Sequence, residues 1–153
     1  MLGSMKSLAC IALLSFSASF AVAGSIGETP SGLIGQFRSA PKRVCVFDAR
    51  GGKPACARVA DVMKIERTPF GGMRDVKVTV RFSLPDSQIC PFEGMGAWNM
   101  HERSLAVVDA RTGCELSLVP SGRELRGMVV RPDRCSSACA SRSWVEGVVF
   151  RRW

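Results

Sequence analysis

DVKVTVRFSL, residues 75–84, alternates strictly between apolar and polar side chains. Its apolar residues would point to one side of an extended chain, and Lys77 and Arg81 to the other. This alternation predicts an antiparallel strand with one buried face. The turn residues Thr68–Gly72 come just before it, and they predict a hairpin with residues 55–67, which we interpret as a strand although their spacing also tolerates a helix.

Other short runs rich in β-branched or bulky residues are separated by glycine-containing turns, as in small all-β proteins. They comprise residues 44–47, 105–108, 114–118, 125–131 and 144–152. We therefore predict an all-β domain, a single small antiparallel barrel or sandwich of about seven strands, over residues 42–153. Residues 24–41 contain four Gly and two Pro with few apolar residues, and they predict a flexible leader.

Residues 1–23 have the pattern of a secretion signal. An apolar run follows Lys6, and Ala21-Val22-Ala23 gives the small-x-small motif, which predicts cleavage before Gly24. The run is shorter than the roughly 20 residues that span a bilayer. We expect a periplasmic or secreted protein that does not span a membrane. Cleavage would lower the formal net charge of +8 by the one lysine of the signal.

Six cysteines follow the signal, and an even number in an exported chain predicts a disulfide framework. They are Cys45, Cys56, Cys90, Cys114, Cys135 and Cys139. Fifteen pairings are possible, and proximity along hairpins favours Cys45–Cys56, Cys135–Cys139 and Cys90–Cys114. Zinc binding at the last close pair would need two further ligands, so neither a metal nor another cofactor is expected.

The chain has one histidine, His101, and this restricts the catalytic chemistry that it could support. No HExxH motif surrounds it, and no phosphate-binding glycine loop is present. A pair of carboxylates such as Glu93 and Glu102 could formally serve a hydrolase, but 13 acidic residues offer many such pairs. We assign no catalytic residue and predict that the chain is not an enzyme.

Basic side chains gather on the predicted hairpin, with Lys77 and Arg81 on its outer face. Such a face attracts acidic partners, although it could equally be an ordinary solvated surface. Nucleic acid is not expected as a partner, because an exported protein seldom meets it and no ladder of aromatic residues lies between the basic ones.

Residues 92–101 combine aromatic and methionine side chains with glycines, the residue types found at recognition surfaces. The candidate binding residues are Phe92, Met95, Trp98, Met100 and His101. The alternative is that the two aromatic residues cover one end of the core.

The tail has a close cysteine pair, Cys135 and Cys139, before a last strand with Gly147, Phe150 and Arg151. It resembles the ending of small exported, cysteine-bridged bacterial β domains, a group that includes lysozyme inhibitors and immunity proteins. The resemblance implies a protein that binds an exported hydrolase or effector, although the basic charge departs from what inhibitors of basic lysozymes need. The alternatives are an envelope factor that binds anionic surface polymers through its basic face, and a small hydrolase using Glu93 or Glu102.

Overall fold

The computed structural model describes residues 26–46, 52–69, 71–84, 89–130, 132–135 and 147–153. The predicted signal peptide and residues 136–146, which include Cys139 and the start of the last predicted strand, therefore lie outside the described residues. The described elements are β1 (Ile26–Gly27), the 3-10 helix η1 (Ser31–Leu33), β2 (Gly35–Ser39), β3 (Lys42–Val46), β4 (Ala55–Val59), β5 (Val62–Arg67), β6 (Val76–Ser83), β7 (Ile89–Asn99), β8 (Ser104–Val108), β9 (Glu115–Ser121), β10 (Glu124–Val129), α1 (Pro132–Cys135) and β11 (Val149–Arg152).

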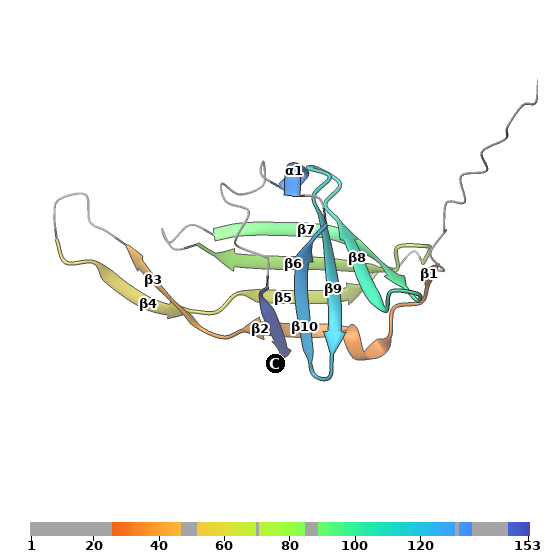
Figure 1. Ribbon diagram of the computed structural model, residues 1–153, viewed down its shortest axis with the longest axis horizontal. Coiled ribbons are helices and arrows are strands. Elements are labelled where there is room, and N and C mark those ends of the chain that lie inside the picture. Colours follow the sequence, from red (N-terminus) through yellow and green to blue (C-terminus); the bar gives the residue numbers. More distant parts are fainter. Residues whose placement is uncertain (1–25, 47–51, 70, 85–88, 131, 136–146) are drawn as a thin grey trace, which may run out of the picture.

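Eight of these strands close into an antiparallel barrel, in the order β2, β5, β6, β7, β8, β9, β10 and β11 (Figure 1). From β5 to β11 each strand pairs with the next one along the chain, and β11 then pairs with β2. Closure leaves the barrel strands without a free edge. The predicted all-β class is confirmed. The predicted hairpin is found for β5 and β6, but the predicted strand over residues 55–67 is divided, because residues 55–59 form β4 and pair with β3 in a separate sheet.

Every second side chain along the strands points into the barrel, and these side chains fill its interior. The apolar residues of β6 are buried, while Lys77 and Arg81 lie on the outer surface, as their spacing predicts. The largest buried side chains include Met63, Phe82, Phe92 and Phe150. The rings of Phe82 and Phe150 meet edge to face with centroids 6.2 Å apart across the interior. The interior is therefore a packed core, as small eight-stranded barrels allow.

Residues 89–99, over which no strand is predicted from the sequence, form strand β7. It pairs with β6 over residues 89–96 and with β8 over residues 95–99, so it turns a corner of the barrel. Gly94 lies at this corner, where an added Cβ would come within 2.7 Å of the carbonyl oxygen of Val108. Such close approach of two backbones requires glycine. Gly94, a glycine of the predicted recognition segment, is thus part of the core.

The N-terminal segment is ordered, whereas residues 24–41 are expected to be a flexible leader. β2 is a barrel strand, and its Phe37 is buried in the core. Ahead of it, the Asp75 carboxylate accepts hydrogen bonds from the backbone N–H and hydroxyl of Thr29, at 2.9 and 2.6 Å. Arg67 donates to the same carboxylate and to the Thr29 carbonyl. This polar cluster attaches the segment to the β5–β6 hairpin.

Strands β3 and β4 form a separate two-stranded sheet, here called the arm, which projects from the barrel between β2 and β5 (Figure 1). At its base lies Asp61, whose side chain is buried. Its carboxylate accepts a 2.9 Å hydrogen bond from Lys42 Nζ and a 2.7 Å one from the backbone N–H of Ser83. These bonds connect the base of the arm to β6.

Two disulfides join described cysteines. Cys45–Cys56 links the two strands of the arm, as predicted. Cys114–Cys135 links the start of β9 to α1, so the predicted pairings Cys90–Cys114 and Cys135–Cys139 are wrong. The two cysteines meet because β9 and β10 are antiparallel, which brings the residues before β9 and after β10 to the same end of the barrel. Cys90 is also disulfide-bonded.

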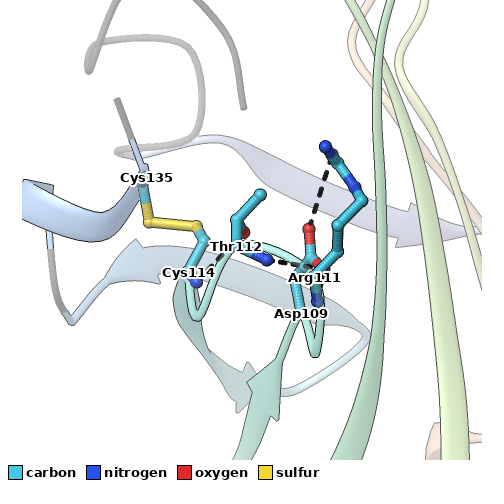
Figure 2. The surroundings of a disulfide bond; sticks show 5 residues. All are labelled: Asp109, Arg111, Thr112, Cys114 and Cys135. Carbon is cyan, nitrogen blue, oxygen red and sulfur yellow. Dashed lines mark hydrogen bonds and ion pairs between the residues drawn. A yellow bond between two sulfur atoms is a disulfide. The ribbon is translucent and has the colours of Figure 1, made fainter. Parts of the chain in front are cut away.

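The turn beside this disulfide is one of the predicted glycine-containing turns, and an aspartate caps it. Asp109 Oδ1 accepts hydrogen bonds from the backbone N–H groups of Arg111 and Thr112, at 2.8 and 3.4 Å (Figure 2). Gly113 has a φ of 72°, which glycine adopts at little cost. The turn thereby sets the position of Cys114 opposite α1.

Candidate functional site

The described part of the arm carries basic residues and no acidic one. Arg43 on β3 and Arg58 on β4 are exposed and directly opposite each other in the pairing register. Like charges at opposed positions destabilise a strand pair. Within the described residues, neither guanidinium has an ion-pair or hydrogen-bond partner. The arm therefore carries an unneutralised positive pair, which an acidic partner would relieve.

The two faces of the arm differ in character. Arg43 and Arg58 share one face with the Cys45–Cys56 disulfide, because positions two apart on a strand point the same way. The other face carries small apolar side chains, among which Val46 is 50% exposed, and Lys42 at its base, which is paired with Asp61. The disulfide limits the conformations of the two strands relative to each other. The arm thus presents a cross-linked basic face and an apolar one.

The outer face of β5 and β6, which the sequence analysis treats as basic, is largely neutralised. Lys77 forms an ion pair of 2.6 Å with Glu93, and Lys64 one of 2.7 Å with Glu66. Arg67 is paired with both Glu28 and Asp75. Arg81 is exposed and has no ion-pair partner in the part of the chain that the structure describes. This face offers far less free positive charge than its composition suggests.

The candidate residues of segment 92–101 do not form one surface. Phe92 is buried in the core, and Met95 lies on the outside of the barrel in register with Val108. Met100 packs on β1, where an added Cβ at Gly27 would come within 2.6 Å of its sulfur. His101 is exposed in the β7–β8 turn, and its backbone N–H donates to Asn99 Oδ1.

Trp98, the remaining candidate of this segment, lines a cavity at the barrel end opposite the arm. This cavity of about 560 Å³ and a neighbouring one of about 420 Å³ share Gly32, Leu33, Pro120 and Gly122 in their walls. We call the two together the end groove. Its apolar lining includes Leu33, Phe37, Trp98 and Pro120, and its charged lining consists of Glu102, Arg103, Arg123, Glu124 and Arg152.

Arg152 builds one wall of the end groove. Its Nη2 donates to the carbonyl oxygens of Gly32 and Ile34, at 2.9 and 2.6 Å, and its guanidinium lies 5.7 Å from the centre of the Phe37 ring. Gly35 has a φ of 143°, a conformation that favours glycine, and the Arg152 guanidinium lies beside it. Arg152 thus holds η1 across the end of the barrel.

Arg103 lines the end groove from the β7–β8 turn and has a φ of 51°. Among the residues that the structure describes, Arg103 is the only non-glycine residue with a positive φ. A left-handed backbone costs a residue with a Cβ about 1 kcal/mol or more, and glycine would avoid this cost. Backbone strain of this kind gathers at functional sites.

The carboxylates considered for hydrolysis are engaged in local contacts. Glu93 forms its ion pair with Lys77, and Glu102 Oε2 accepts a 3.4 Å hydrogen bond from the Ser104 hydroxyl. Over the described ranges, no group of three or more His, Cys, Asp or Glu residues could hold a metal ion. Nor is any described helix long and apolar enough to cross a membrane.

The chain matches no protein-family model, no curated protein and no solved structure. The Arg43–Arg58 pair was not predicted from the sequence, although the predicted pairing of Cys45 with Cys56 contains the signal. In an antiparallel hairpin that register places residue 43 opposite residue 58. No sequence signal identifies Arg103, because its conformation depends on how the β7–β8 turn closes.

Proposed function

We propose that this chain is an exported binding protein that docks its basic arm on an acidic surface of an exported hydrolase or effector, as an inhibitor or immunity-type factor. The observation that carries the proposal is the unneutralised Arg43–Arg58 pair on a cross-linked, projecting hairpin. Its disulfides are compatible with an exported protein.

The shape and charge of the arm both suit insertion into a cleft. A hairpin held by a disulfide loses little conformational freedom on binding, so less of the interaction energy is spent on ordering it. Glycoside hydrolases place two carboxyl groups on either side of the scissile bond. Two guanidinium groups side by side would meet such carboxylates with charge-assisted hydrogen bonds.

Binding to an anionic envelope polymer through Lys77 and Arg81 has less support. Lys77 is paired with Glu93, so a polymer would have to displace that carboxylate. Of Lys77 and Arg81, only Arg81 has no ion-pair partner among the described residues and would be free to bind the polymer.

The test is a panel of purified exported glycosidases, peptidoglycan hydrolases and effectors, each assayed for inhibition and for complex formation. The double variant R43E/R58E should weaken binding of the partner at least 100-fold, because two attractive contacts become repulsive. The control R74E/R126E changes the net charge equally at exposed positions away from the arm. It should change affinity by less than about threefold at physiological salt, where distant charges are screened.

Two results would contradict the proposal. One is the absence of a complex with every hydrolase and effector in the panel. The other is equal loss of binding in R43E/R58E and R74E/R126E, which would show a dependence on net charge alone, as expected for an anionic polymer.

A further inference from the structure

The end groove has the dimensions and chemical lining of a ligand site, separate from the arm. Each of its two parts falls within the roughly 300–1,000 Å³ typical of small-molecule sites. Its floor is apolar, with Leu33 buried and Trp98 partly buried beneath the opening. A flat or extended apolar body could therefore lie against this floor and exclude water from it.

The charges around the end groove are unequally neutralised. Glu124 is bonded to Arg151 Nε at 2.8 Å, and Arg152 is held by backbone carbonyls. Arg103 and Arg123 are exposed and have no ion-pair or hydrogen-bond partner among the residues that the structure describes. Glu102 is the opposing charge, so the rim keeps a net positive charge. This rim would attract an anion.

The conformation of Arg103 gives an independent indication. A glycine at this turn position would remove the strain of the positive φ, yet the chain carries an arginine that faces the groove. Strained backbone positions gather at functional sites, and this one presents a free guanidinium beside an apolar floor.

We propose that the end groove binds a small amphipathic anion, with its apolar body on Leu33, Trp98 and Pro120 and its carboxylate, phosphate or sulfonate group at the positive rim to which Arg103 and Arg123 contribute. The inference does not rest on the proposed role of the arm, which lies at the other end of the barrel.

Two fluorescent probes test the inference on the whole exported chain. 8-Anilinonaphthalene-1-sulfonate carries an aromatic body and a sulfonate, whereas N-phenyl-1-naphthylamine has a similar body without the charge. We expect one saturable site for the sulfonate. R103G and R123Q should each weaken its binding about tenfold, the scale of one charge-assisted hydrogen bond, and leave the neutral probe unchanged.

The matched control is R126Q, because Arg126 is exposed on β10 and does not line the groove. Its affinity for the sulfonate should equal that of the unaltered chain. Thermal unfolding of each variant checks that the probe is not binding to partly unfolded protein, which also binds this sulfonate. R103G should unfold at an equal or higher temperature, because it removes the positive-φ strain.

Competition identifies the source of the anion. Displacement of the sulfonate probe by dodecanoate would indicate a fatty-acid-like ligand, and displacement by indole-3-acetate an aromatic acid; either result supports the proposal. It is overturned if neither displaces the probe, if the sulfonate shows no saturable binding, or if R126Q weakens binding as much as R103G and R123Q.

Discussion

Removing the two described disulfides one at a time should have unequal effects on stability. Cys114 and Cys135 are buried with the barrel core, whereas Cys56 is exposed on the arm. The bridges close 21 and 11 residues. The chain-entropy model gives about 3 kcal/mol for each of them. A disulfide adds this amount to the free energy of global unfolding only if the segment that it closes unfolds together with the barrel.

The double variant C114A/C135A should lower the free energy of unfolding by about 3–5 kcal/mol, because buried sulfur contacts are lost along with the cross-link. C45A/C56A should lower it by less than about 1 kcal/mol, because the arm is a separate sheet that can open while the barrel stays folded. Urea denaturation followed by tryptophan fluorescence measures both values.

Hydrogen exchange distinguishes the local from the global effect. In C45A/C56A the amides of β3 and β4 should exchange faster, while those of β6 and β9 keep their protection. Equal losses of about 3 kcal/mol in the two double variants would refute this reasoning, since they would show that the arm unfolds only with the barrel.

Three further predictions concern the barrel. Gly94→Ala should cost about 1–3 kcal/mol in urea denaturation, because its Cβ would collide with the backbone of β8, whereas Gly32→Ala, which meets no atom within 4 Å, should change stability by less than about 0.5 kcal/mol. Asp75→Asn should weaken the attachment of the N-terminal segment by about 2 kcal/mol, seen as faster hydrogen exchange around η1, and unchanged exchange there would contradict the role given to this carboxylate. Peptide mapping of the exported protein should find Cys90 joined to Cys139, the remaining cysteine after the signal; a free thiol at either position would count against three bridges.

The sequence predicts the parts of this fold whose pattern is local. Strand β6 follows directly from its alternation, and the Cys45–Cys56 bridge follows from proximity in one hairpin. β7 was missed because Pro91 and two inward-facing glycines interrupt its pattern, and these glycines are explained only by the barrel corner that they permit.

Features that depend on closure of the barrel could not be predicted from local sequence patterns. β2 has a single buried aromatic residue, Phe37, in a glycine-rich segment, and it becomes a strand because β5 and β11 lie on either side of it. The Cys114–Cys135 bridge requires knowledge that β9 pairs with β10. The end groove could not be predicted either, because its lining comes from distant parts of the chain, including η1, the β7–β8 turn, the β9–β10 turn and β11.

The placement of the cross-links divides the molecule chemically. All five described cysteines lie on the arm or at the barrel end from which it leaves, while the opposite end is joined by the Asp75 and Arg152 hydrogen bonds. A thiol reductant would therefore act chemically on one pole of this protein, because the hydrogen bonds at the other pole contain no reducible bond. Reduction of the exposed arm bridge alone would loosen the arm, whereas reduction of the buried Cys114–Cys135 bridge would weaken the whole barrel.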